Sequence, residues 1–185
     1  RWMSPYFLGI GMGYMLFQLG LHQRLILILG HPTFALSVVL SSMLLGTGLG
    51  AAASARLFGP ARAPRAWLTI LVVLAALTAS FPAIAVLERI GSSGGRAAAA
   101  AVVLAATGFV LGFAFPLGIR LVAPTGQWAV QKMWAVNGAA SIAGSALAAF
   151  LGITLGSHAV LAAGLVTYAL ATLCGYRAWR LAAVT

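Results

Sequence analysis

The side chains best suited to chemistry in this chain of 185 residues gather in one short stretch near its beginning. This stretch contains Gln18, His22, Gln23, Arg24 and His31. Gln18 and His22 are four residues apart, so on a helix they share one face with Tyr14. Amide, imidazole and guanidinium groups within an apolar helix normally face other helices or a water-filled cavity, because exposure to lipid is costly.

Two interpretations of this polar stretch stay open. In the first, Gln18 and His22 are hydrogen-bonding groups of a binding site between helices, and Arg24 anchors an anionic ligand. In the second, the same groups hold the protein together by bonding to backbone carbonyls of neighbouring helices. The predicted ligand-binding residues are Gln18, His22, Gln23, Arg24 and His31, together with Asn137 from a second polar stretch at residues 134–141.

Residue types needed for catalysis and metal binding are scarce. Glu88 is the only acid and lies near the end of an apolar stretch, so no carboxylate is available there for acid–base chemistry or a proton relay. His22 and His31 are nine residues apart, which is not a helical ligand spacing. Cys174 is the only cysteine. We therefore expect no catalytic residue, no metal site and no cofactor in this segment.

Composition defines the class of protein. Apolar residues make up 62% of the chain and charged residues 6%, and the mean hydropathy is +1.05. Soluble domains carry about 25% charged residues. Twelve charged side chains cannot cover a water-facing surface of this size, so the composition excludes a soluble globular protein. It predicts an all-α polytopic membrane protein.

Apolar stretches of about 20 residues predict membrane-spanning helices. Six such stretches are separated by glycine, proline and charged residues, and we expect them to form a single transmembrane domain over residues 1–185. The predicted spans are residues 5–29, 33–55, 67–87, 97–122, 133–155 and 158–176. Pro82 and Pro116 fall within spans and are expected to kink them.

The basic residues predict the orientation. Lys and Arg collect in cytoplasmic loops, and a cytoplasmic N-terminus places eight of them inside and three outside. Both termini are therefore predicted to be cytoplasmic. Because the basic residues lie singly between apolar runs, the net charge of +10 does not indicate nucleic-acid binding.

Small residues at intervals of four predict close helix packing. Such spacing lets helix backbones approach one another in lipid. The pairs and stripe are Gly9 and Gly13; Gly46 and Gly50; Gly108 and Gly112; and Ala140, Gly144, Ala148 and Gly152.

Several motifs are distinctive when taken together: Gly-Met-Gly-Tyr-Met at residues 11–15, Gln23-Arg24, the stretches 29–40 and 44–50, Phe-Pro-Leu-Gly at 115–118, and residues 134–141. In these motifs the chain resembles the membrane domain of bacterial spermidine synthase-like integral membrane proteins. The resemblance implies a bundle similar to one half of a major facilitator transporter, following a cytoplasmic aminopropyltransferase-like domain. A start at Arg1 rather than Met fits that order. The family often has Glu where this chain has Gln18.

Three functions are expected from these observations. The first is a membrane domain that moves or presents a small polar molecule, with an anionic or neutral ligand favoured over a polycation. The second is a structural or accessory subunit of a larger membrane complex. The third is the membrane anchor of an aminopropyltransferase-like enzyme. The expected surroundings are the lipid bilayer of the bacterial inner membrane and another membrane chain or a fused soluble domain.

Overall fold

The computed structural model describes residues 2–58, 62–80 and 86–182, and every regular element within them is helical. The helices are α1 (Met3–Leu29), α2 (Pro32–Leu57), α3 (Ala63–Ser80), α4 (Ser93–Leu111), α5 (Ala114–Val122), η3 (Ala123–Thr125), α6 (Gln127–Leu155) and α7 (Ser157–Ala182). Six segments are long and apolar enough to cross a membrane, with α4, α5 and η3 forming one of them. The fold is all-α and polytopic, as the composition predicted.

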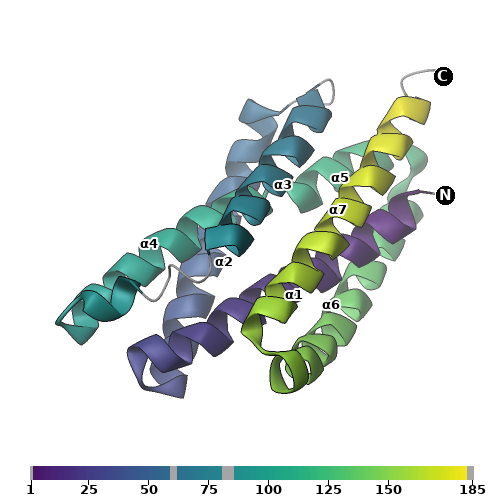
Figure 1. Ribbon diagram of the computed structural model, residues 1–185. Helices are drawn as coiled ribbons and strands as arrows, with labels where there is room; N and C mark the ends of the chain where they lie inside the picture. Colours follow the sequence, from purple (N-terminus) through teal and green to yellow (C-terminus); the bar gives the residue numbers. More distant parts are fainter. Residues whose placement is uncertain (1, 59–61, 81–85, 183–185) are drawn as a thin grey trace.

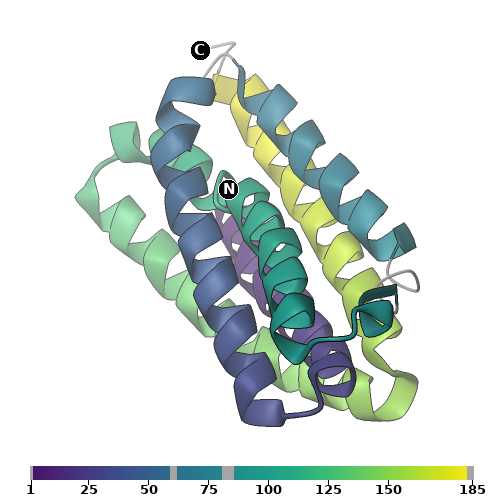
Figure 2. The same cartoon turned by 90° about the vertical axis from the view of Figure 1, so that its left-hand side faces the viewer.

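Helix α1 lies at the centre of the bundle (Figure 1). It packs along α6 and α7, whereas α2 packs mainly against α4 and α3 lies against α7. Figure 2 shows the same arrangement from the side, with α2 and α4 next to one another. Half of the residues in the apolar stretch of α1 are buried (50%), compared with 17% in α6. The core is therefore built around the first helix.

The helix boundaries differ from the predicted spans in several places. The third span begins earlier, at Ala63, and the last extends to Ala182. The fourth begins at Ser93 and is interrupted at Gly112 and Phe113, just before Pro116. A proline has no backbone N–H to continue the helical hydrogen bonds, which explains the break. Pro82 lies outside the described residues.

The junctions between helices use residues suited to them. Gly30 ends α1 with a φ of 77°, a left-handed conformation that glycine adopts without strain, and its N–H donates to the Ile26 carbonyl. Pro32 then occupies the first turn of α2, where a missing N–H costs nothing. At the start of α4, the Ser92 hydroxyl accepts a hydrogen bond of 3.1 Å from the Gly95 N–H.

The predicted glycine pairs bring α2 and α4 into backbone contact. A Cβ atom added to Gly46 or Gly50 would collide with the backbone of Ala105 or Phe109. The relation is reciprocal, because a Cβ atom on Gly108 would lie 2.6 Å from the Met43 carbonyl oxygen. Such close approach maximises van der Waals contact. This contact drives helix association in a membrane, because lipid is as apolar as the side chains and burial away from it gives no hydrophobic gain.

Tyr6 joins four helices at one end of the bundle. Its hydroxyl donates to the Ala114 carbonyl of α5 at 2.5 Å and accepts from the Trp67 indole N–H of α3 at 3.3 Å. Its ring fills the space left by Gly175 of α7 and makes an edge contact with Phe7. The side chain is fully buried. Tyr6 therefore fixes α3, α5 and α7 relative to α1.

The α2–α4 contact can be tested with Gly50→Leu. We expect this change to lower the free energy of unfolding by about 2 kcal/mol, because overpacking a tight contact forces the helices apart. The measurement is thermal unfolding in detergent, followed by circular dichroism. Gly48→Leu is the matched control, since a Cβ atom at Gly48 meets nothing within 4 Å. Equal transition temperatures for the two variants would contradict the packing described here.

Candidate functional site

A cavity lies between α1, α2, α6 and the break that separates α4 from α5. Its volume is about 580 Å³. Polar lining comes from Tyr14 on α1, Thr47 on α2, and Asn137 and Ser141 on α6. The other lining residues are Ile10, Gly11, Leu44, Gly48, Ala51, Leu111, Gly112, Ala114, Phe115, Pro116, Trp134 and Tyr168. We call this cavity the central pocket.

The interrupted crossing shapes one wall of the central pocket. Gly112 and Pro116 both line it, and Pro116 supplies no N–H to the Gly112 carbonyl four residues earlier. That carbonyl therefore lacks its usual helical partner. Because the α2–α4 contact fixes Gly112 against α2, the break stands at a defined place beside the cavity.

Tyr14 and Thr47 place hydroxyl groups near one another from opposite walls. The Tyr14 hydroxyl is buried and approaches Thr47, but no described residue forms a hydrogen bond of ordinary geometry with it. The Thr47 hydroxyl donates to the Met43 and Leu44 carbonyls of its own helix, at 2.9 and 3.1 Å. A buried hydroxyl without a partner is costly, so Tyr14 is an available donor at the pocket wall.

Asn137 serves both the bundle and the central pocket. Its side-chain N–H donates to the Phe7 carbonyl at 3.1 Å, which links α6 to α1. Ser141 lies one turn later and donates to the Asn137 carbonyl at 2.9 Å and to the Gly11 carbonyl at 3.4 Å. Gly11 allows this approach, because a Cβ atom there would collide with the Asn137 backbone. The Asn137 amide nitrogen therefore holds α6 against α1.

Aromatic rings form a connected series beside these polar groups. Phe115 and Trp134 meet edge to face, with ring centroids 4.6 Å apart, and Phe7 contacts Phe115 in the same way at 5.3 Å. Edge-to-face contacts fix ring orientation beyond what burial alone achieves. Trp134 nevertheless keeps 61% of its surface exposed, so it stands at the rim of the pocket.

Of the six predicted ligand-binding residues, Asn137 alone lines the central pocket. Gln18 lies one turn after Tyr14 on the same face of α1 and is 7% exposed. His22 lies farther along α1, where an imidazole nitrogen is 3.5 Å from the Pro32 carbonyl oxygen at the start of α2.

The remaining predicted residues point to different places. Gln23 donates to the Ala148 carbonyl of α6 at 3.2 Å, and its amide oxygen is buried without a partner. Arg24 lines a separate, mainly apolar cavity of about 250 Å³ together with residues of α3 and α4. His31 is exposed in the turn between α1 and α2. Gln23, Arg24 and His31 therefore do not converge on Asn137.

Two other arginines, which the sequence analysis did not predict as site residues, contact the ends of neighbouring helices. Arg120 of α5 donates to the Ser54 hydroxyl and to the Ser54 and Phe58 carbonyls at the end of α2, over 3.3 to 3.4 Å. Arg96 of α4 donates to the Ile28 carbonyl at the end of α1, at 2.9 Å. A cation stabilises the C-terminal end of a helix, where unpaired carbonyls gather negative charge. In the sequence, only their position near the end of a predicted span indicated this role for Arg96 and Arg120.

The chemistry available in the central pocket is binding by hydrogen bonds and aromatic contact. None of the described residues that line it carries a formal charge. In residues 2–58, 62–80 and 86–182, no three His, Cys, Asp or Glu side chains are grouped closely enough to hold a metal ion.

Fold and pocket together define an all-α polytopic membrane protein with a polar and aromatic cavity between its helices. No family model, curated protein or solved structure matches the chain.

The structural role of Asn137 can be measured with Asn137→Leu. Loss of the hydrogen bond to the Phe7 carbonyl is expected to lower the free energy of unfolding by about 1 kcal/mol, a usual value for a hydrogen bond between membrane helices. Gln131→Leu is the control, because Gln131 is exposed on the same helix. Unfolding in detergent would show a lower midpoint for Asn137→Leu alone; similar midpoints would argue against this structural role of Asn137.

Proposed function

We propose that this chain is a membrane domain that binds a small molecule carrying a polar group in the central pocket, and moves or presents it. The observation that carries the proposal is the buried Tyr14 hydroxyl, which lacks a partner at the wall of a 580 Å³ cavity. Tyr14, Thr47 and Ser141 lie near the middle of their helices. Polar groups at such depth are costly and are typical of ligand pathways.

The resemblance to spermidine synthase-like membrane proteins supports the same proposal. In that family the membrane helices accompany an aminopropyltransferase-like domain. The anchor function depends on such a soluble domain, which would supply the catalytic groups.

An accessory function is the second proposal, and the exposed side of α6 favours it. Ala135, Ala139 and Ala143 are exposed at intervals of four along this helix, and α6 is the least buried of the six crossings. Small residues on a lipid-facing side permit close approach of another helix. Copurification of a second membrane chain in fixed ratio would support this function.

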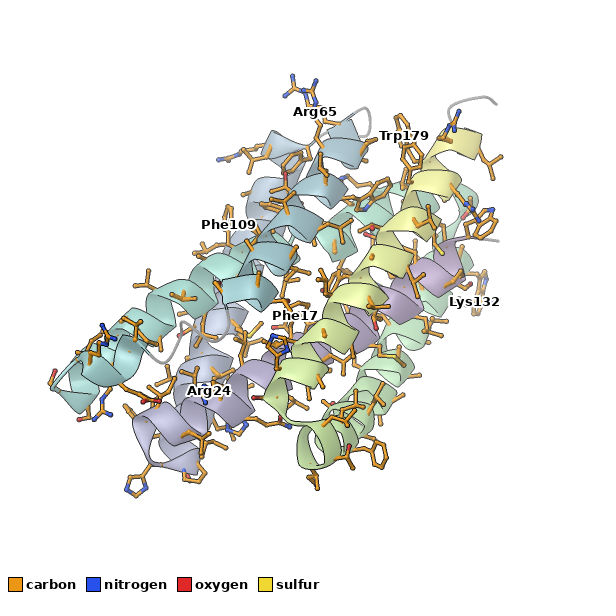
Figure 3. The ribbon with its side chains drawn as sticks, in the orientation of Figure 1. Phe17, Arg24, Arg65, Phe109, Lys132 and Trp179 are labelled. Atoms are coloured by element: carbon orange, nitrogen blue, oxygen red, sulfur yellow. The ribbon has the colours of Figure 1, made fainter. Side chains whose placement is uncertain are left out.

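We also propose that the chain lies in the bacterial inner membrane with both ends in the cytoplasm. The end of the bundle that holds the α2–α3 and α5–α6 connections carries seven basic residues in the described part of the chain: Arg56, Arg62, Arg65, Arg120, Lys132, Arg177 and Arg180. The opposite end carries Arg24, Arg89 and Arg96. Figure 3 shows Arg65 and Arg24 at these opposite ends. The more basic end is the one expected to stay inside.

Cysteine labelling tests this orientation. In a Cys174→Ala background, Gly91→Cys should react with a membrane-impermeant maleimide in intact cells, because position 91 is exposed at the less basic end. Arg62→Cys, exposed at the other end, should react only after the cells are opened. The reverse pattern would show the opposite orientation.

Filling the central pocket tests the binding function. Gly48 lines the pocket and has open space in front of it, so Gly48→Trp should occupy the cavity without disturbing the helix contacts. We expect a small molecule extracted from the purified wild-type protein to be absent from this variant, as measured by mass spectrometry.

Gly138→Trp is the control for this experiment. Gly138 is also exposed and faces open space, but it does not line the pocket. The extracted molecule should remain with this variant. Equal retention by both tryptophan variants would place the binding site elsewhere and overturn the proposal.

A further inference from the structure

We infer that the ligand of the central pocket is an uncharged, largely apolar molecule with a hydrogen-bond acceptor beside a flat ring. This inference rests on the proposed function and specifies its ligand class. Four properties of the pocket lead to it: the absence of charge, the unpaired Tyr14 donor, the aromatic rings and the opening between α2 and α6.

The absence of charge excludes an ionic ligand. No described residue that lines the pocket is charged, and the basic residues lie toward the two ends of the bundle. Burying an ion in such a place without a counter-charge is far more costly than burying a neutral molecule. Arg24, which we expected to anchor an anionic ligand, lines the other cavity and supplies no counter-charge to the central pocket.

The Tyr14 hydroxyl specifies an acceptor on the ligand. It forms no hydrogen bond with a described residue, and the single Thr47 proton beside it is shared between the Met43 and Leu44 carbonyls. A ligand carbonyl, ether or similar oxygen near Tyr14 would satisfy the hydroxyl and gain a bond in a place with little water.

The aromatic residues specify a flat ring. Phe115 and Trp134 hold each other edge to face, and Tyr14 and Tyr168 add their rings to the same cavity. Such rings present apolar faces and polarised edges that pair well with another aromatic system. Much of the remaining lining is aliphatic, which favours an apolar body attached to the ring.

The opening lies between α2 and α6, on the side of the bundle. Leu44 and Trp134 line the pocket and are still 60% and 61% exposed, and Gly48 is a third lining residue that is exposed. An apolar chain attached to the ring would therefore extend toward lipid, where its burial carries no cost.

Three matched probes test the ligand class on the full chain in nanodiscs. Decylnaphthoquinone has the ring, the acceptors and the chain; decylnaphthalene lacks the acceptors; and a sulfonated decylnaphthoquinone adds a negative charge. Saturable binding of tritiated decylnaphthoquinone is measured by scintillation proximity, and the other two compounds compete with it. We expect decylnaphthalene to compete about fivefold less well, the effect of one hydrogen bond, and the sulfonate at least about tenfold less well.

Variants connect the binding to particular residues. Tyr14→Phe should raise the Kd of decylnaphthoquinone about fivefold and leave that of decylnaphthalene unchanged, because it removes only the donor. Tyr176→Phe is the matched control, since Tyr176 is exposed on α7 and does not line the pocket. Gly48→Trp should abolish saturable binding of every probe, whereas Gly138→Trp should not.

Each other outcome overturns a stated part. Competition by the sulfonate at equal or lower concentration would overturn the uncharged class, and an unchanged Kd in Tyr14→Phe would overturn the acceptor. No saturable probe binding, with a natural molecule still lost from Gly48→Trp, would refute this inference and leave the proposed function standing. Probe binding that persists in Gly48→Trp, together with retention of the natural molecule, would refute both.

Discussion

In a lipid bilayer, moving an apolar side chain from lipid into the protein interior gives little free energy. Helices must therefore be held together by close contact and by hydrogen bonds. This constraint accounts for the positions of the glycines in the chain. Gly46, Gly50 and Gly108 bring α2 and α4 into backbone contact, and Gly11 and Gly144 do the same for α1 and α6. Tyr6, Asn137 and Arg120 then donate hydrogen bonds to backbone carbonyls of neighbouring helices. Without these close approaches, the polar atoms would not reach one another.

The contacts divide the bundle into two closely packed groups, α2 with α4, and α1 with α6 and α7. The central pocket lies where these groups meet, and each contributes part of its polar lining, Thr47 from the first and Tyr14 and Asn137 from the second. The break before Pro116 adds a carbonyl without its helical donor. Polar groups needed for packing, such as the Asn137 amide nitrogen, thus lie beside groups that packing leaves unused, such as the Tyr14 hydroxyl. One side chain can serve stability while its neighbour is available for binding.

Much of the fold follows from the sequence, because a membrane-spanning helix must satisfy its backbone internally and therefore needs a long apolar stretch. The glycine spacing also predicted close packing, although not that Gly46 would face Ala105. The candidate site was harder to foresee. Gln18 to Arg24 form the most polar run, yet a helix turns these neighbours toward different partners. The polar lining of the pocket comes instead from Tyr14, Thr47, Asn137 and Ser141 on three separate helices. Likewise, Arg24 and Arg120 look alike in sequence, and only the folded chain shows that Arg120 caps the end of α2.

The central position of α1 has a consequence for how the chain is made. Helix α1 has the lowest mean hydropathy of the six crossings, 1.2, and the largest buried share, 50%. Its main partners are α6 and α7, which leave the ribosome after α2 to α5. During synthesis, Asn137 and Ser141 have not yet been made when α1 enters the bilayer. Their hydrogen bonds to the Phe7 and Gly11 carbonyls can therefore form only after α6 has been inserted. The least apolar of the six described crossings therefore enters the membrane before its main partners exist, which makes the docking of α6 and α7 onto α1 a late event in the assembly of this bundle.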